Sequence, residues 1–474
     1  MLFNSIEFLL FLPIVFGMYW AVAKNVRLQN LFVIAASYLF YGWWNWKCLL
    51  LIAFTTLCSY VCGLGIERVR MSARKSKAVC GLNIVVNLMI LGVFKYYDFF
   101  ALSFHDLMAR MGFEVDVITL HLLLPVGISF YTFQAVGYSI DVYRNKIGAA
   151  HDIAAFFAFL SFFPQLVAGP IERASNLYPQ FLCRKRFDYD MAVEGCWMIL
   201  WGFFKKIVIA DGAAVVVNTV FDSAGNYNAA TLWMAAILFA FQIYGDFSGY
   251  SDIAIGVARL FGIRLMRNFN LPYLSHNVAE FWRRWHISLN TWFVDYLYIP
   301  LGGSKGGTLK TLRNTVIVFL VSGLWHGANW TYVAWGAYHA LLFVPLLYFG
   351  KRRVVPRGRC SRIAGIVVTF LLVTVGWVIF RACDIHHAFG YIQSMLSLNI
   401  FSMPDLPKKT LFYAVECFAA IGFLIVMECK CKNKDLTLAL PFRSYRVRRI
   451  GYIALSVWTF LFYSVGQTFI YFQF

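Results

Sequence analysis

The chain has 474 residues, of which 60% are hydrophobic and 14% charged, and its mean hydropathy is +0.65. Because a soluble globular domain carries roughly 25% charged residues, this composition excludes an ordinary soluble enzyme. Lys and Arg number 42 against 23 acidic residues, a formal net charge of +19. In a membrane protein such a surplus collects in cytoplasmic loops and faces anionic lipid, so we expect a lipid bilayer and no nucleic acid as its partner.

The 11 cysteines are scattered, and none has the CxxC spacing of a metal site. The sequence also contains no GxSxG motif, no P-loop and no dinucleotide fingerprint. We therefore expect no metal ion, no disulfide framework and no tightly bound cofactor.

Long apolar segments predict an all-α, polytopic integral membrane protein, because a bilayer core admits only helices or closed barrels. Roughly 11–12 membrane-spanning helices are expected, and residues 1–474 are expected to form one membrane-embedded domain. The first span is predicted to be uncleaved, since no positive residue precedes it. The spans lie at about residues 5–23, 29–46, 48–66, 78–97, 120–141, 192–217, 230–258, two across 312–348, 363–381, 411–428 and 450–472.

The charge of the loops predicts the orientation of the chain. Basic residues follow the first, third and fifth spans, at 24–27, 68–77 and 144–146, whereas the segment 98–119 is net acidic. Later basic loops at 351–362 and 430–449 fit the same side. Since basic loops stay in the cytoplasm, the N-terminus is predicted to lie outside.

Two stretches do not fit a pattern of simple spans. Prolines and glycines interrupt the apolar segment 153–187, and the segment 271–303 is dense in Trp and Arg. Irregular or polar backbone at membrane depth is tolerated only where it is buried in protein or lines a wet cavity. Both stretches are therefore candidates to line a site.

His326 lies in SGLWHGANW, within an apolar segment whose other ionisable side chains are His339 and tyrosines. A histidine in a span is costly and often functional, although packing with a hydrogen bond to a carbonyl explains its position about equally well. Its neighbours in the sequence favour a functional role over packing alone. Small residues on either side leave space for a ligand, while Trp325, Asn329 and Trp330 supply hydrogen-bond donors and flat walls.

His286 is the second candidate, in FWRRWHISLN. If this stretch is one helix, Trp282, His286 and Asn290 share a face. Arg283 and Arg284 could bind a phosphate-bearing acyl donor or lipid headgroups. Interfacial anchoring explains the arginines about as well as function does, but it explains His286 less well.

Asp246 and Asp252 lie in YGDFSGYSDIAIGVARLFGI, where glycines and serines form a stripe for close helix packing. An unpaired carboxylate at mid-membrane costs roughly 2.5–3.5 kcal/mol, so both require buried partners. Pairing with an arginine is slightly favoured over a role as catalytic acid. Asp246 is also a candidate to line a substrate tunnel.

A buried neutral histidine with few carboxylates nearby suits acyl transfer. The histidine acts as general base on an acceptor hydroxyl that attacks a thioester, while Trp or Asn donors stabilise the oxyanion. His326 and His286 are the catalytic candidates, and Trp325, Asn329, Trp330, Trp282, Arg283, Asn290 and Asp246 are the candidates for a substrate or donor tunnel.

Four motifs carry a resemblance to a known family: FWRRWHISLNTWFVDYLYIPLGG, YGDFSGYSDIAIGVARLFGI, FFPQLVAGPIER and SGLWHGANWTYVAWGAYHA. They resemble the membrane-bound O-acyltransferase family, most closely its alginate O-acetyltransferase branch. The D-alanyl transferase of teichoic acid modification is a closer relative than the sterol or protein acylating members. The opening segment, ASYLFYGWW and the closing FIYFQF also resemble that branch, so the resemblance covers essentially the whole chain, with a motif core at about 120–348.

The resemblance implies a ring of helices around a central tunnel, with re-entrant or interfacial helices, in a bacterial inner (plasma) membrane. The family's invariant histidine, taken as the base, corresponds to His326, and a second histidine corresponds to His286. The donor, acetyl-CoA or another acyl thioester, would enter from the cytoplasm. The acceptor would be an alginate-like exopolysaccharide, reached through a separate periplasmic hydrolase-like acetyltransferase protein.

Two other functions remain open at this point. The same fold could transfer D-alanine from an acyl carrier protein to teichoic acid. A transporter or channel in which His326 relays protons is the alternative from another class, although the scarcity of carboxylates at mid-span argues against it.

Overall fold

The computed structural model describes residues 1–167, 169–350, 358–431, 444–463 and 469–470. Within these ranges every regular element is a helix, which confirms the predicted all-α class. The chain divides into two compact units, residues 1–195 with 257–266, and residues 196–256 with 267–474. Each unit is described by itself below, over its described residues.

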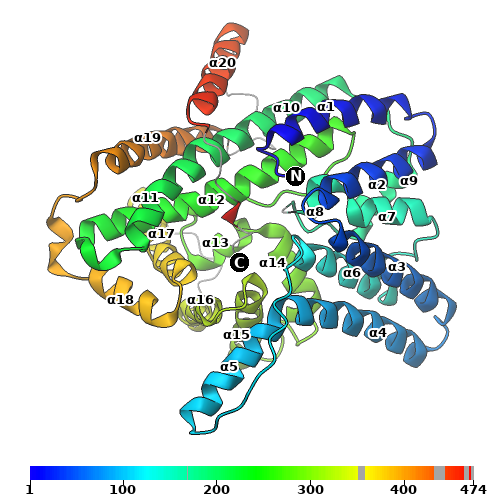
Figure 1. The fold of residues 1–474 in the computed structure, drawn as a ribbon, viewed down its shortest axis with the longest axis horizontal. Coiled ribbons are helices and arrows are strands. Elements are labelled where there is room, and N and C mark those ends of the chain that lie inside the picture. The colour runs from blue at the N-terminus through cyan, green and yellow to red at the C-terminus, as the bar shows by residue number, and fades with distance from the viewer. Residues whose placement is uncertain (168, 351–357, 432–443, 464–468, 471–474) are drawn as a thin grey trace. The chain divides into compact units, whose positions relative to one another are not determined.

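The first unit contains the helices from the N-terminus to residue 182 (Figure 1). They are α1 (Ile6–Ala21), α2 (Val26–Gly42), α3 (Lys47–Arg68), α4 (Ala73–Leu91), the π-helix η1 (Gly92–Tyr96), α5 (Tyr97–Arg110), α6 (Ile128–Tyr143), α7 (Ile153–Ser161), α8 (Phe163–Leu166) and α9 (Ala174–Leu182).

Helix α6 forms the centre of the first unit, since nearly all of its side chains are buried and it packs against α3 and α4. The approach to α3 requires a glycine, because a Cβ on Gly63 would lie 2.2 Å from the Tyr138 hydroxyl oxygen. That hydroxyl accepts a hydrogen bond from the amide of Ala150, 2.9 Å away, which ties the segment after α6 to the same place.

Two predicted boundaries in this unit are wrong. The segment 98–119 was expected to be a loop, but α4, η1 and α5 follow one another without a break to Arg110. The span expected at 120–141 begins only at Ile128 and ends at Tyr143. The π-turn at Gly92–Tyr96 lets the helix continue to Arg110, beyond the end predicted at residue 97.

The stretch 153–187 is broken into short helices, as its prolines and glycines predicted. Pro164 lies in the first turn of α8, and Glu172 follows in a segment without regular structure. The Glu172 carboxylate accepts hydrogen bonds from Asn176 and from the amide of Met266. Burial raises the pKa of Glu172 to about 7, although these hydrogen bonds oppose the shift.

The second unit contains most of the remaining helices (Figure 1). The elements of this part of the chain are α10 (Tyr189–Phe203), the π-helix η2 (Phe204–Asp211), α11 (Gly212–Phe221), η3 (Ala224–Asn226), α12 (Ala229–Leu260), η4 (Pro272–Leu274), α13 (Val278–Arg284), α14 (Ile287–Phe293), the π-helix η5 (Val294–Tyr298), α15 (Thr308–His326), α16 (Trp330–Tyr348), α17 (Arg359–Arg381), α18 (Ile385–Met395), η7 (Leu398–Phe401), α19 (Lys408–Cys431) and α20 (Tyr445–Leu461).

Helices α15 and α16 form a tight antiparallel pair. Glycines allow this contact, because a Cβ on Gly323 would lie 2.2 Å from the carbonyl oxygen of Tyr332, and one on Gly336 would lie 2.3 Å from that of Phe319. The pair packs against α17 and places His326, the last residue of α15, at the turn.

Five of the described helices are long and apolar enough to cross a membrane, and α1 is a shorter apolar helix. The number of about 12 spans stays a prediction, since other expected spans correspond to shorter or interrupted helices. In the last predicted span, 450–472, helix α20 ends at Leu461, and residues 464–468 and 471–472 lie outside the described residues. Parts of the basic loops and of the C-terminal motif, at 351–357, 432–443, 464–468 and 471–474, lie outside the described residues. The five helices lie at 47–68, 73–110, 229–260, 359–381 and 408–430.

Candidate active site

His326 is buried in an aromatic cage at the end of α15, with a relative exposure of 6%. Its ring centroid lies 5.0 Å from that of Trp325, 5.2 Å from that of Trp335 and 5.4 Å from that of Phe380. The extended conformation of Gly327 ends the helix directly after the histidine. The site therefore holds an imidazole in surroundings that exclude most water.

His286 belongs to the same cluster and is 1% exposed. Its Nδ1 lies 3.0 Å from the side-chain oxygen of Asn268, and the ring of Phe247 packs edge-on against it at 4.7 Å. Trp325 links the two histidines, because its ring lies 6.0 Å from His286 and 5.0 Å from His326. The structure thus brings both predicted histidines together from segments 40 residues apart in sequence.

The charge state of His286 follows from its burial. His286 lies outside every predicted membrane span. Desolvation, and to a lesser extent the positive charge of a protonated His326, hold the pKa of His286 well below its usual value. It is therefore a neutral imidazole at physiological pH, as a general base must be before it accepts a proton.

The segment around His286 is not one continuous helix, so the condition for a shared face is not met. Helix α13 ends at Arg284, α14 begins at Ile287, and His286 between them has a left-handed backbone with φ +44°. Asn290 donates hydrogen bonds to the carbonyl oxygens of Trp282 (2.6 Å) and Trp285 (2.5 Å), and so closes the break. Trp282, His286 and Asn290 consequently do not share the face of one helix.

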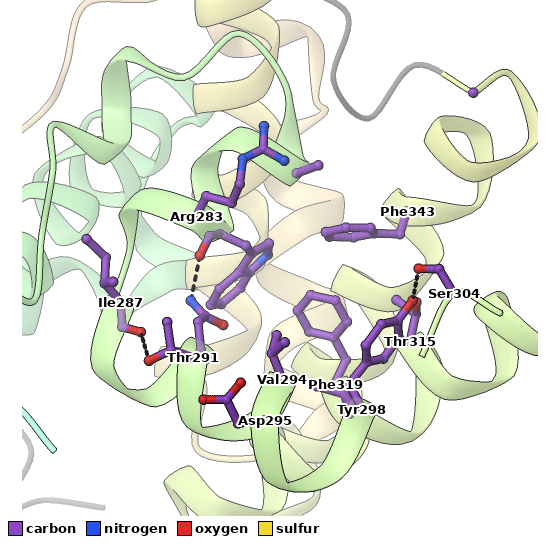
Figure 2. Close-up of a pocket in the computed structure, with 15 residues that line it drawn as sticks. Arg283, Ile287, Thr291, Val294, Asp295, Tyr298, Ser304, Thr315, Phe319 and Phe343 are labelled. Atoms are coloured by element: carbon purple, nitrogen blue, oxygen red, sulfur yellow. Dashed lines mark hydrogen bonds between the residues drawn. The ribbon is translucent and has the colours of Figure 1, made fainter. Parts of the chain in front are cut away.

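Trp282, Arg283 and Asn290 instead line a pocket of about 770 Å³ in the second unit (Figure 2). Its lining is largely apolar and aromatic, and it includes hydroxyl groups and two charged side chains. Figure 2 shows the Arg283 guanidinium and the Asp295 carboxylate at opposite ends of the view. The full lining is Ala279, Trp282, Arg283, Ile287, Asn290, Thr291, Val294, Asp295, Tyr298, Ser304, Thr315, Val318, Phe319, Phe343 and Gly350.

Two tryptophans connect this pocket with His326. The ring of Trp282 lies 5.5 Å from that of Trp335, which in turn packs against His326. The indole nitrogen of Trp282 donates to Nδ1 of the fully buried His339 at 3.4 Å, which fixes the ring on the pocket side. An amphipathic pocket and a buried imidazole are thus separated by two aromatic layers.

The other predicted tunnel residues near His326 occupy different places. Trp325 is buried between the histidines. Asn329 begins α16: its side-chain oxygen accepts from the amide of Thr331, and its nitrogen donates to the carbonyl of Cys383 at 2.9 Å. Trp330 is 52% exposed and so lies at the periphery.

Asp246 has a buried cationic partner, but the partner is a lysine and not the arginine expected. Asp246 Oδ1 lies 2.6 Å from Lys206 Nζ, and its Oδ2 accepts from the amide of Ile470 at 2.6 Å. Lys206 also pairs with Asp211 at 2.7 Å. Asp252 pairs with Lys205 at 2.5 Å. These ion pairs fix α12 against η2, and the residue after Asp246 is Phe247, which packs on His286.

Sequence reasoning missed Asn268, Trp335 and the two lysines as parts of the site. Lys205 and Lys206 carried a signal, since they are two adjacent cations inside an apolar segment and must be paired there. Trp335 lies in the same motif as His326. Asn268 carried no such signal in the sequence, because nothing around it relates it to a histidine 18 positions later.

A model of the membrane-bound O-acyltransferase family matches residues 144–382, a range that contains every residue of the cluster. The chain is 42% identical over 415 residues to the "Probable alginate O-acetylase AlgI" of Pseudomonas aeruginosa, covering 87% of this chain and 78% of that protein. It is 34% identical to the "Peptidoglycan O-acetyltransferase" of Helicobacter pylori, covering 100% and 98%. A "Teichoic acid D-alanyltransferase" of Bacillus subtilis is 29% identical over 56% of this chain and 71% of that protein. The match to the family model, together with these identities, shows that the chain is an O-acyltransferase and belongs to the membrane-bound O-acyltransferase family.

Proposed function

We propose that this protein is an O-acetyltransferase of a bacterial inner membrane that moves an acetyl group from a cytoplasmic thioester outward, for O-acetylation of an alginate-like exopolysaccharide. The observation that carries the proposal is the buried pair of histidines joined by Trp325. Two buried imidazoles suit removal of a proton from a hydroxyl. Two relatives of this chain are named for O-acetylation of alginate or of peptidoglycan.

The reaction needs two proton transfers, one from the acceptor hydroxyl to an imidazole and one from the imidazole to the leaving thiolate. As the acceptor oxygen attacks the thioester carbonyl, its O–H bond breaks and the proton passes to an imidazole of the cluster. A C–O bond forms, the tetrahedral intermediate collapses, the C–S bond breaks, and the proton goes to the departing thiolate. The aromatic cage favours this chemistry because it excludes the water that would otherwise hydrolyse the thioester.

The pocket of Figure 2 is the proposed donor site. Its apolar lining suits the acyl end of a thioester, and Arg283 suits a phosphate of acetyl-CoA or of a carrier-protein arm. This arrangement supports a soluble thioester donor, either acetyl-CoA or an acyl carrier protein. A separate periplasmic hydrolase-like protein would complete the transfer to the polymer.

Peptidoglycan is the second candidate acceptor, and a specific observation favours it. The peptidoglycan O-acetyltransferase of Helicobacter pylori matches this chain over 98% of its own length, whereas the alginate O-acetylase of Pseudomonas aeruginosa, although more similar, matches over 78%. Transfer of D-alanine to teichoic acid is less supported, since the match covers 56% of this chain.

The test uses a strain that lacks the chromosomal gene, complemented with the wild type, with His326→Ala or with the control His386→Ala, whose side chain is exposed. Ester-linked acetate is measured in exopolysaccharide and in peptidoglycan, and label transfer from acetyl-CoA is measured with purified protein. We expect His326→Ala to abolish acetylation of one polymer while His386→Ala retains it. Undiminished acetate with His326→Ala would overturn the proposal, and loss from peptidoglycan alone would select the second acceptor.

A further inference from the structure

Asn268 is a buried side chain placed against His286, with a relative exposure of 1%. Its oxygen Oδ1 lies 3.0 Å from His286 Nδ1, 2.9 Å from the hydroxyl of Ser288 and 3.4 Å from the amide nitrogen of Ser288. Its nitrogen Nδ2 donates to the hydroxyl of Ser251 at 3.2 Å. All polar atoms of the amide group are therefore engaged.

The backbone amide of Ser288 decides which way the Asn268 amide faces. A hydroxyl can donate or accept, but a backbone N–H can only donate, so the Asn268 atom opposite it must be the oxygen. The same oxygen faces His286 Nδ1, so this nitrogen must carry a proton. Since a neutral imidazole has one N–H, the lone pair of His286 lies on Nε2.

The backbone around His286 is held by Asn268 and by its neighbour Asn270. The carbonyl oxygen of Asn268 accepts from the amide of Ile287 at 2.8 Å, and the amide of Asn270 donates to the carbonyl of Arg284 at 2.9 Å. These bonds stabilise the left-handed conformation of His286, which is costly for a residue with a Cβ and is concentrated at functional sites in proteins. Asn268 therefore fixes both the main chain and the ring of His286.

We infer that Asn268 is the positioning residue of a second catalytic base: it holds His286 in the tautomer whose Nε2 accepts the proton of the acceptor hydroxyl. The inference rests on the proposed acyl transfer and assigns His286 a role within it. With the proton fixed on Nδ1, Nε2 has no hydrogen to donate to an oxyanion. His286 enters the reaction as a proton acceptor, and Asn268 acts through it as an orienting group without touching the substrate.

The direct test is the tautomer. We would label the histidines of the purified full-length protein with ¹⁵N, assign His286 by comparison with His286→Gln, and record which ring nitrogen carries the proton. We expect a protonated Nδ1 in the wild type and a mixture of tautomers in Asn268→Ala. A proton on Nε2 of the wild-type ring would overturn the inference, whatever the activity of the protein.

The kinetic test compares Asn268→Ala, Asn268→Asp and a control, Asn226→Ala, in an exposed 3₁₀-turn. Asn268→Ala should lower kcat about 10²-fold with little change in KM for the donor, a size typical of a displaced acid–base group. Asn268→Asp keeps an acceptor oxygen, so it should recover most of kcat. Its negative charge should also raise the pKa of His286 and move the acid limb of the rate profile to higher pH. His326 is the ionisable group that acts electrostatically on His286 in the wild type.

These results separate the inference from the proposed function. If the wild type transfers acetyl but Asn268→Ala does so at the full rate, the inference fails and the function stands. If the wild type transfers no acetyl, the proposed function fails, while the tautomer still decides the role of Asn268. A purely structural role predicts that Asn268→Asp changes stability without moving the pH profile, and that outcome also overturns the inference.

Discussion

At the scale of single residues, Lys206 is the centre of a buried ion cluster, with Asp211 at 2.7 Å and Asp246 at 2.6 Å. Removing one member of a buried ion pair leaves an uncompensated charge and costs about 3–5 kcal/mol. We predict that Lys206→Met destabilises the protein by this amount, and that Asp246→Asn costs less because Lys206 keeps Asp211. The free energy of unfolding in mixed detergent and denaturant checks the order.

The control for this prediction is Lys305→Met, in the exposed turn before α15. An exposed charge is solvated by water in both states, so its loss should change stability by about 0.5 kcal/mol or less. Equal effects of Lys206→Met and Lys305→Met would show that the buried cluster does not stabilise α12 against η2.

Glu172 makes the stability of the first unit depend on pH. Its folded pKa is raised to about 7, whereas the unfolded value is 4.5, so the folded state binds the proton more tightly. The resulting stabilisation is fully present below pH 4.5 and is lost as the pH rises through 7, by at most about 3 kcal/mol. We predict that the melting temperature falls between pH 5 and pH 8, and that Glu172→Gln reduces this fall. A melting temperature that rises equally for both proteins over this range contradicts the assignment.

The residues that could be predicted from sequence are polar side chains whose burial in an apolar segment costs free energy in any fold. A histidine or a carboxylate in an apolar segment is expensive wherever the fold places it, which is why His326, His286 and the need of Asp246 for a partner were foreseen. Asn268 could not be found in this way, because an amide in a loop is ordinary until the fold places it beside His286. The identity of the Asp246 partner likewise depends on which helices pack together.

At the scale of elements, the α15–α16 pair depends on two glycines. A Cβ on Gly336 would lie 2.3 Å from the carbonyl oxygen of Phe319, a backbone atom that cannot rotate away. We predict that Gly336→Ala separates the helices and costs about 1–3 kcal/mol, as overpacking typically does. It should also lower acetyl transfer, because Phe319 lines the pocket and His326 ends α15.

The matched control is Gly422→Ala in α19, where an added Cβ would meet nothing within 4 Å. Alanine is the better helix former, so this variant should be neutral or more stable by up to about 1 kcal/mol. Thermal unfolding of the two variants in the same detergent measures the difference. If both substitutions are neutral, the close approach of α15 and α16 is not required for the fold.

Long apolar helices were predicted from hydropathy more accurately than helix breaks that depend on local backbone conformation. The apolar runs at 230–258 and 363–381 correspond to α12 and α17 within a few residues. The break between α13 and α14 was missed, because WRRWHISLN has no proline or glycine to mark it. The break exists because the hydrogen bonds of Asn268 and Asn290 compensate the strained His286. Asn290 belongs to the same segment, whereas only the tertiary fold brings Asn268 to His286.

At the scale of the whole molecule, the basic residues behind the net charge of +19 include both buried and exposed side chains. Lys205 and Lys206 are buried and neutralised by aspartates, so they contribute nothing to orientation. The run of basic residues around Met71, which is fully exposed, predicts that this loop lies in the cytoplasm. The sidedness of the protein therefore depends on these exposed cations, and it can be tested apart from the chemistry of the site.

We predict that an epitope tag inserted after Met71 is inaccessible to antibody in intact spheroplasts and becomes accessible after permeabilisation, because the surrounding run at 68–77 carries five basic side chains. A tag after Glu114, in the net acidic segment beyond α5, should bind antibody without permeabilisation. Exposed turns tolerate such insertions, and acetylation by the tagged proteins would show that they are folded. The opposite pattern at both positions would show that the predicted orientation of this part of the chain is wrong.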